Sequence, residues 1–263
     1  MAMTYDTLAI ERCGAVATVW MDRPEVFNAF DEQLIAELAA ACTALDADAG
    51  VRVVVLAGRG KHFSAGADLN WMRRAADSSE ADNLADSRKF AAMLHTLASM
   101  SKPTIARVQG AALGGGTGLT AACDMAIAAA DASFATSEVK FGIIPAVISP
   151  YVLRAIGPRH ALRYFQSAER FGAAEAKAMG LVSEVVAVDE LDAAVDRLVQ
   201  ALLACGPQAQ LAAKQLIAAI NGRPIDPEVG EETATRIARQ RATAEAREGF
   251  AAFFEKRQPA WMA

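Results

Sequence analysis

Basic charge is scarce in this chain. Its 263 residues include 26 lysines and arginines against 31 aspartates and glutamates, so the net charge is -5. Proteins that bind nucleic acid present a clustered basic surface, often interleaved with aromatic side chains. Neither feature is present here, and we expect no nucleic-acid partner.

Cysteine and histidine are also few. The four cysteines lie far apart with no CxxC pair, and the three histidines are scattered: Cys13, Cys42, Cys123, Cys205, His62, His95 and His160. These spacings do not match a zinc site, so we expect no metal. We interpret the cysteines as reduced packing residues, which predicts a reducing compartment.

Long apolar runs and hydrolase motifs are missing as well. The most apolar stretch, residues 111–130, is interrupted by glycines and by Asp124, so it predicts a buried strand–turn–helix and not a membrane span. The first residues show no basic region followed by an apolar stretch, so we expect no signal peptide and a cytoplasmic protein. No serine lies in a GxSxG setting, which argues against a serine hydrolase.

Apolar periodicity predicts an α/β protein of two contiguous regions in one cooperative unit. Strands and helices alternate over residues 1–188, and helices alone are predicted over 189–263. The predicted strands are 8–12, 15–21, 51–56, 104–108, 125–129, 133–135 and 181–188. The predicted helices begin at 31, 82, 119, 149, 159, 173, 191, 207, 226 and 249. Ser149 is predicted to cap its helix, with Pro150 in the first position.

The stretch Val108–Gly118, VQGAALGGGTG, is the most informative in the chain. It joins an apolar strand to a buried helix through Gly114, Gly115 and Gly116. Free N–H groups at a helix start favour an anion or a developing oxyanion. A tight turn with close packing explains the same glycines, and the pattern alone leaves both interpretations open.

A second glycine turn lies upstream, in the sequence FSAGADL of residues 63–69. It follows a predicted buried strand, and open α/β sheets bind ligands at such carboxyl ends. Asp68 caps a turn or touches a ligand, with capping favoured. Trp71 and Met72 line a pocket or fill the core beside it.

Glu138 is the candidate acid–base group. It lies among apolar residues in a segment closed by Gly142 and Pro145. Desolvation there would favour its neutral form and raise its pKa, as catalysis near neutral pH requires. The alternative is an ion pair with Lys140 or an arginine.

Taken together, FSAGADL, ALGGG and Glu138 followed by GIIP resemble the crotonase superfamily of enoyl-CoA hydratases and isomerases. The resemblance covers nearly the whole chain. It implies a spiral of ββα units, a C-terminal helical region that forms a trimer or a hexamer, and acyl-CoA thioester substrates. No cofactor is implied beyond the coenzyme A of the substrate, and no membrane partner.

The resemblance also assigns residues. The N–H groups of Ala67 and Gly115 would stabilise the thioester enolate beside Glu138. Substrate-binding positions would be Ala65, Gly66, Asp68, Leu69, Gly114, Gly118, Tyr151 and Lys256. Lys256 and Arg257 would contact CoA phosphates, or else are solvated charges near the chain end.

One position departs from the family pattern. Its hydratases commonly carry a second glutamate twenty residues before the one that corresponds to Glu138, and this chain has Gly118 there. Three activities remain open: a hydratase with a changed mechanism, a Δ3,Δ2-enoyl-CoA isomerase with a single glutamate, and other enolate chemistry. A non-catalytic acyl-CoA-binding or scaffold protein is a further alternative, and RNA binding is disfavoured by the charge.

The segment from Ile144 to Val152, IPAVISPYV, most resembles bacterial methylglutaconyl-CoA and carboxygeranoyl-CoA hydratases of leucine and acyclic-terpene breakdown. That resemblance implies a branched or carboxylated enoyl-CoA such as 3-methylglutaconyl-CoA. We hypothesise that Ser149, Tyr151 and Arg154 receive its distal carboxylate and that Gly118 makes room for a branch. The alternative roles are a helix cap for Ser149, core packing for Tyr151 and a surface ion pair for Arg154.

Overall fold

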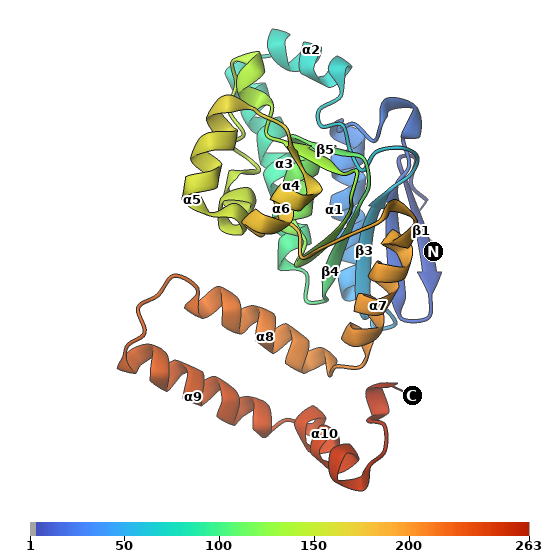
Figure 1. Ribbon diagram of the computed structural model, residues 1–263, viewed down its shortest axis with the longest axis vertical. Helices are drawn as coiled ribbons and strands as arrows, with labels where there is room; N and C mark the ends of the chain where they lie inside the picture. Colours follow the sequence, from blue (N-terminus) through green and yellow to red (C-terminus); the bar gives the residue numbers. More distant parts are fainter. Residues whose placement is uncertain (1–3, 263) are drawn as a thin grey trace.

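The computed structural model describes residues 4–262, and Figure 1 shows their arrangement. Six strands form the larger sheet in the order β1-β2-β3-β4-β6-β9, in which only the β1–β2 pair is antiparallel. Its strands are β1 Leu8–Cys13, β2 Val16–Met21, β3 Val53–Gly58, β4 Thr104–Val108, β6 Met125–Ala129 and β9 Glu184–Val186. The predicted hairpin turns at Gly14, whose φ of 57° suits glycine.

A smaller sheet is formed by β5 Ala111–Leu113, β7 Ser133–Ala135 and β8 Phe171–Gly172, in that order. The chain alternates between the two sheets: β4 and β6 join the larger one, and β5 and β7 directly after them join the smaller one. A helix follows each such pair of strands. The result is the spiral of ββα units that the family resemblance implies.

The helices are α1 Glu32–Ala47, α2 Leu69–Asp77, α3 Glu80–Ser99, α4 Gly115–Ala122, α5 Ser149–Ser167, α6 Ala173–Met179, α7 Leu191–Leu203, α8 Pro207–Ile220, α9 Pro227–Arg241 and α10 Ala244–Glu255. Short 3-10 helices are η1 Pro24–Val26, η2 Glu138–Phe141, η3 Val188–Glu190 and η4 Ala260–Met262. Asp31 caps α1 by accepting a hydrogen bond from the Leu34 N–H at 2.9 Å. Among residues 4–262, none of the helices combines the length and apolar composition that a membrane crossing requires.

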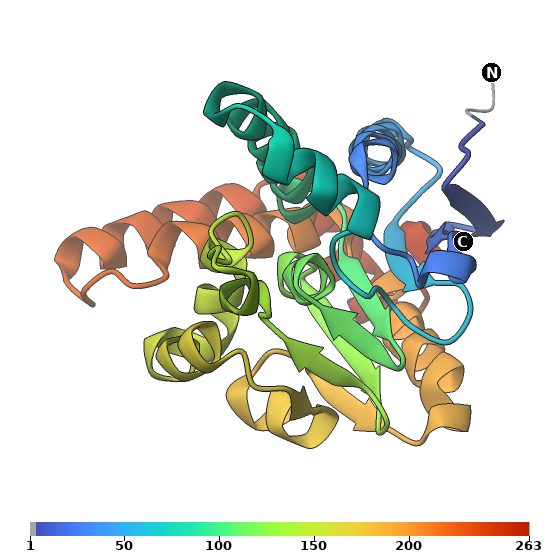
Figure 2. The ribbon, with the colours of Figure 1, turned by 90° about the horizontal axis from the view of Figure 1, so that it is seen from above.

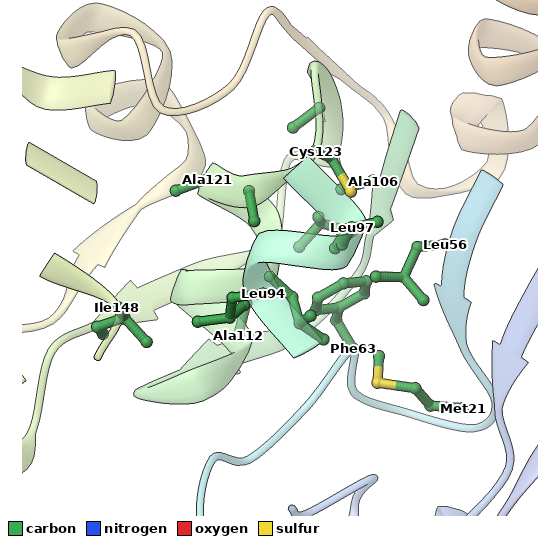
Figure 3. Close-up of a cluster of buried hydrophobic side chains, with 14 of the residues drawn as sticks. Met21, Leu56, Phe63, Leu94, Leu97, Ala106, Ala112, Ala121, Cys123 and Ile148 are labelled. Carbon is green, nitrogen blue, oxygen red and sulfur yellow. The ribbon is translucent and has the colours of Figure 1, made fainter. Parts of the chain in front are cut away.

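Both faces of the larger sheet are covered. Figure 2 shows α1 and α3 on one side of it and α7 on the other. Alternate residues of β3 point to the two sides, so Val54 and Leu56 join the main core while Val53 and Val55 pack with α7. Figure 3 shows part of that main core, which runs from Met21 and Leu56 through Phe63 and Leu94 to Ile148.

Helices α8, α9 and α10 form a layer below the sheets in Figure 1. Lys214 of α8 pairs with Asp124 at 2.8 Å, and Arg52 donates to the carbonyl oxygens of Leu203 at 3.0 Å and Trp261 at 2.8 Å. By contrast, α7 packs on the sheet itself. The helical region predicted from residue 189 therefore begins with a helix that belongs to the core. Residue 263 of that region and residues 1–3 of the first region lie outside the described residues.

Several element boundaries differ from the predicted ones, and three further local differences concern α2, β9 and Ser149. Helix α2 was not predicted, and no residue of it is buried. Strand β9 is shorter than the predicted 181–188. Ser149 does not cap α5: Ile148 is the capping position, and the Ser149 hydroxyl donates to the Ala146 carbonyl oxygen at 2.7 Å.

Candidate active site

The two glycine turns meet at the end of the smaller sheet. Gly66 has a φ of 92°, and a side-chain Cβ added there would lie 3.0 Å from the Leu113 carbonyl oxygen. Only glycine allows this approach. The Phe30 N–H donates to Gly66 O at 2.7 Å and the Asp68 N–H donates to Phe30 O at 2.8 Å. Ala67, between them, is exposed and its N–H is left over.

Helix α4 begins beside this turn. Gly114 is its capping residue, and the Gly114 N–H donates to the Ala135 carbonyl oxygen at 2.8 Å. Gly115 is the first helical residue, so its N–H has no acceptor within the helix. A Cβ at Gly115 would meet the Phe30 ring at 3.0 Å and the Phe90 ring at 3.2 Å. In the part of the chain that the structure describes, the N–H groups of Ala67 and Gly115 both lack an acceptor.

Glu138 lies against the same point. A Cβ added at Gly114 would lie 3.4 Å from Glu138 Oε1 and 3.9 Å from Gly66 Cα. One carboxyl oxygen and the two glycine turns therefore converge within a few ångströms. The structure shows the tight packing of the glycines, and this packing brings the two free N–H groups close to the carboxyl. The functional interpretation stays a prediction.

The Glu138 carboxyl is desolvated and forms no ion pair in the described part of the chain. Its Oε2 is buried without a hydrogen-bond partner, and no salt bridge of Glu138 occurs among the described residues. Burial raises its pKa above the ordinary value of 4.5, and a hydrogen bond from its own backbone N–H opposes that shift. The alternative of an ion pair with Lys140 is thus not what the structure shows.

Such a set of groups suits enolate chemistry. Two N–H groups, one of them at a helix start, stabilise negative charge on a carbonyl oxygen. A carboxyl with a raised pKa is able both to donate and to accept a proton near neutral pH. An oxyanion site of this kind needs backbone N–H groups and no side chain, so the small residues at these positions are compatible with one.

Comparison with known proteins agrees with this geometry. Residues 11–263 match the family model for enoyl-CoA hydratase/isomerase. The chain belongs to the enoyl-CoA hydratase/isomerase family. A crystal structure of an enoyl-CoA hydratase from Shewanella pealeana has a TM-score of 0.94 and 44% identity, covering 97% of this chain and 96% of that one.

Relatives in this family carry different activity names. A crotonyl-CoA hydratase from Syntrophomonas wolfei is 34% identical over 97% of this chain and 98% of its own. A 4-chlorobenzoyl coenzyme A dehalogenase from Arthrobacter is 33% identical over 75% of this chain and 72% of its own. Our chain is thus an enzyme of the hydratase/isomerase family, and its reaction has to be argued from its own site.

Asp68 and Leu69 begin α2 in this family member. The Asp68 carboxylate accepts from the N–H groups of Asn70 at 2.8 Å and Trp71 at 3.3 Å, and it lies 3.4 Å from the Arg23 guanidinium. This is the capping role that the sequence favoured, so any substrate contact of Asp68 comes from its backbone. The Leu69 side chain is 69% exposed at the start of the same helix, which leaves it free to contact a ligand.

Ala65 borders a cavity of about 350 Å³. Leu113 and Phe27 supply apolar walls, Lys61 and Arg170 supply cations, and Asp131 supplies an anion. His62, which also lines it, accepts from the Ala111 N–H through Nδ1 at 3.0 Å. Desolvation, with Lys61 and Arg170 nearby, lowers the pKa of His62, so the ring is a neutral donor through Nε2.

Gly118 does not open space for a substrate, which corrects our expectation. A Cβ added at Gly118 would lie 2.3 Å from Ile148 Cγ2 and 2.8 Å from Ile148 Cβ. Gly118 is buried and Ile148 is only 2% exposed. The room that a side chain at 118 would take is already filled by isoleucine, so neither a branched acyl chain nor a second carboxylate fits there without displacement.

Tyr151 and Lys256 have different relations to the site. Tyr151 is half-buried near the start of α5, which packs against η2, with the Arg154 guanidinium 5.9 Å from its ring. Lys256 caps the end of α10, which Figure 1 shows at the opposite end of the molecule from α2 and α5. Within one chain the structure does not bring Lys256 to Glu138. Arg257 is held by Glu248 at 2.6 Å and Glu255 at 2.7 Å.

The sequence indicated Trp71 as a pocket or core residue, but it did not indicate that Phe30 and Phe90 pack beside Gly115. Phe30 and Phe90 have ring centroids 5.5 Å apart, and Trp71 lies 6.5 Å from Phe90. They come from three segments distant in sequence, so no local motif joins them. The one available signal was their apolar character beside the two glycine turns. Ile148 was identified from the sequence only as a member of the segment from Ile144 to Val152, without a role of its own.

Proposed function

We propose that this chain hydrates a branched or carboxylated enoyl-CoA such as 3-methylglutaconyl-CoA. The observation that carries the proposal is the buried Glu138 carboxyl, whose Oε2 has no hydrogen-bond partner among residues 4–262, beside the free N–H groups of Ala67 and Gly115. The thioester oxygen would accept from both N–H groups and take up charge as water adds. The crotonyl-CoA hydratase relative supports the reaction class.

Glu138 would serve as both base and acid. It takes a proton from water as the oxygen bonds to C3, and the electron pair of the double bond moves onto the thioester oxygen as an enolate. The same carboxyl then returns a proton to C2, which restores the carbonyl. One water is consumed, no electrons are exchanged, and the reaction needs no cofactor beyond the CoA of the substrate. The raised pKa of Glu138 supports this double role.

The CoA portion would extend from the oxyanion site toward the cavity beside Ala65. Lys61 and Arg170 at that cavity offer charge for phosphate groups, and the His62 Nε2–H offers a neutral donor. If Lys256 binds a CoA phosphate, as the resemblance implies, it binds one held by a neighbouring copy of the chain.

A distal carboxylate on the acyl group would need a cation or hydroxyl partner, because a desolvated unpaired carboxylate is very costly. Tyr151 and Arg154 are the candidates on α5, the helix that packs against the Glu138 segment. Arg154 is exposed and forms no salt bridge among the residues described, so it is available. Ser149 is a weaker candidate, since its hydroxyl already donates to Ala146.

The first test replaces the acid–base group. Glu138→Gln keeps the shape of the side chain, so we expect wild-type folding and CoA binding with kcat lowered at least about 100-fold. Glu190→Gln, an exposed glutamate on η3 without a salt bridge, is the matched control. A loss below tenfold in folded Glu138→Gln protein contradicts the proposed mechanism.

The second test identifies the substrate. We expect kcat/KM for 3-methylglutaconyl-CoA hydration to exceed those for crotonyl-CoA hydration and 3-enoyl-CoA isomerisation. Arg154→Ala and Tyr151→Phe should raise KM for the carboxylated substrate alone, while Arg159→Ala, an exposed arginine of the same helix, should not. If kcat/KM for crotonyl-CoA hydration equals that for 3-methylglutaconyl-CoA hydration, the distal carboxylate plays no part in substrate selection and that part of the proposal is contradicted.

The isomerase alternative rests on one observation. Isomerisation needs a single group that moves a proton between C4 and C2, and the packing of Ile148 on Gly118 leaves no space on α4 for a second carboxylate. Dominant conversion of 3-enoyl-CoA to 2-enoyl-CoA would establish it. Binding of all these thioesters without conversion would identify a non-catalytic family member.

We also propose that the chain assembles as a trimer or a dimer of trimers. The C-terminal helices leave large apolar side chains exposed: Ile217 at 66%, Phe253 at 77% and Phe254 at 77%. Such faces are usually covered by a neighbour. The free cysteines, of which Cys42 and Cys123 are buried, are compatible with the cytoplasmic location we propose.

A further inference from the structure

Ile148 occupies a defined place relative to the catalytic carboxyl. Gly114 is the residue that caps α4, and the Gly118 N–H donates to the Gly114 carbonyl oxygen at 3.1 Å, so the two positions are one helical turn apart. The Gly114 position meets Glu138 Oε1 and the Gly118 position meets Ile148. The Glu138 carboxyl and the Ile148 side chain therefore lie against positions one turn apart at the start of α4.

The surroundings of Ile148 make it a rigid wall. It is 2% exposed, it directly precedes α5, and α5 packs against both α4 and η2. Figure 3 shows it at one margin of the core cluster, with Leu94, Ala112 and Ala121 as the nearer labelled members. Its β-branched side chain has little freedom about χ1. The close contact at Gly118 restricts it further, because a move toward α4 would bring atoms into overlap.

We propose that Ile148 is a specificity-determining residue that limits the size of the acyl substituent next to Glu138. This rests on the proposed function, because it concerns the same acyl site. An apolar branched wall at this place accepts a small substituent on C3 and rejects a larger one. It also keeps water away from Glu138, which fits a carboxyl oxygen that is buried without a partner.

Few other groups act on that carboxyl. Lys140 lies on the same short helix, Tyr151 and Arg154 lie on α5, and α4 carries no ionisable side chain. Burial is the cause that raises the pKa of Glu138, and no neighbouring charge contributes to the shift. A change of the wall beside it should therefore change its titration.

The experiment compares Ile148→Ala and Ile148→Val with Ile156→Ala. Ile156 is buried on the same helix and eight residues away, roughly 12 Å by helical rise. It serves as the control for a cavity of equal size away from the site. For each protein, kcat/KM is measured with 2-enoyl-CoA thioesters bearing hydrogen, methyl or ethyl on C3, and the pH–rate profile is recorded with the best of them.

One methylene more or less in an apolar pocket changes the ratio of kcat/KM between two substrates by about 10- to 200-fold. We expect the ethyl-to-methyl ratio of kcat/KM to rise at least about tenfold in Ile148→Ala, less in Ile148→Val, and by no more than about twofold in Ile156→Ala. The apparent pKa of Glu138 in the pH–rate profile should fall only in the Ile148 variants, because the enlarged site admits water.

An unchanged ratio and an unchanged pH profile in folded Ile148 variants would overturn the role of Ile148 and leave the proposed hydration intact. Should Ile148→Ala fail to fold, Ile148→Val, which removes one methylene, decides the question through the same two measurements. A wild-type enzyme without activity on any of the three thioesters, but active after another acyl group is supplied, would instead refute the proposed substrate class.

Discussion

Gly118→Ala tests the packing on which the site geometry depends. The added Cβ would lie 2.3 Å from Ile148 Cγ2 and 2.8 Å from Ile148 Cβ. Because one of these contacts is to Cβ itself, rotation about χ1 of Ile148 does not relieve it. The backbone of α4 or of residue 148 has to move, and that movement is transmitted to Gly115 and η2.

Two opposing terms set the size of the effect. Alanine in a helix interior is favoured over glycine by about 1 kcal/mol, whereas overpacking a buried site costs about 1–3 kcal/mol. Both contacts are far below ordinary van der Waals distance, so the upper end applies. We expect a net loss of about 2 kcal/mol, or about 4–8 °C in Tm for a chain of this length.

Urea and thermal unfolding at one protein concentration measure this loss. Gly230→Ala is the matched control, since Gly230 is helical and exposed and a Cβ there meets nothing within 4 Å. That variant should gain stability. Combining Gly118→Ala with Ile148→Ala should give a favourable coupling of about 1–3 kcal/mol in a double-mutant cycle. A Gly118→Ala protein as stable as Gly230→Ala, or a cycle without coupling, would refute the packing explanation.

Three further predictions address the rest of the molecule. Burial raises the pKa of Glu138 in the folded state, so the folded chain binds the carboxyl proton more tightly than the unfolded chain. The stability of the wild-type protein therefore falls as pH rises through that raised value. In urea unfolding, Glu138→Gln should be more stable than the wild type at about pH 8, and the difference should vanish at about pH 4. Arg52→Ala removes hydrogen bonds to Leu203 and Trp261 and should cost about 2 kcal/mol or more, seen as a lower urea midpoint. Light scattering at micromolar concentration should report a trimer or hexamer, and a monomer would contradict the proposed assembly.

The backbone part of the site was readable from the sequence. Glycine at 66, 114 and 115 permits left-handed angles or close approach, and these are properties of single residues. The desolvation of Glu138 followed from its apolar neighbours and the closure of its segment. Alternation of strands and helices gave the fold class for the same reason, because periodicity is a local property.

Two of the missed features depend on the arrangement of residues that are distant in sequence. Gly118 and Ile148 are thirty positions apart, and the sequence shows a small residue at 118 without showing what fills the space beside it. Lys256 lies near the chain end in sequence, and only the layer formed by α8–α10 places it away from Glu138 in one chain. Helix α2, which buries no side chain, was not predicted, although its cap, Asp68, was recognised.

The two kinds of substrate contact proposed for the site come from different atoms, namely backbone N–H groups and side chains. The N–H groups of Ala67 and Gly115 belong to the backbone, so their positions are fixed by the two sheets and by the glycine contacts between them. Selection of the acyl group must then come from side chains, and those proposed here, Ile148, Tyr151 and Arg154, follow Glu138 within a single segment of the chain. Changes in that segment would alter the substrate without disturbing the oxyanion site. The relatives of this chain include a crotonyl-CoA hydratase and a 4-chlorobenzoyl coenzyme A dehalogenase, so one family fold carries more than one reaction, and the reaction of each member has to be argued from its own side chains.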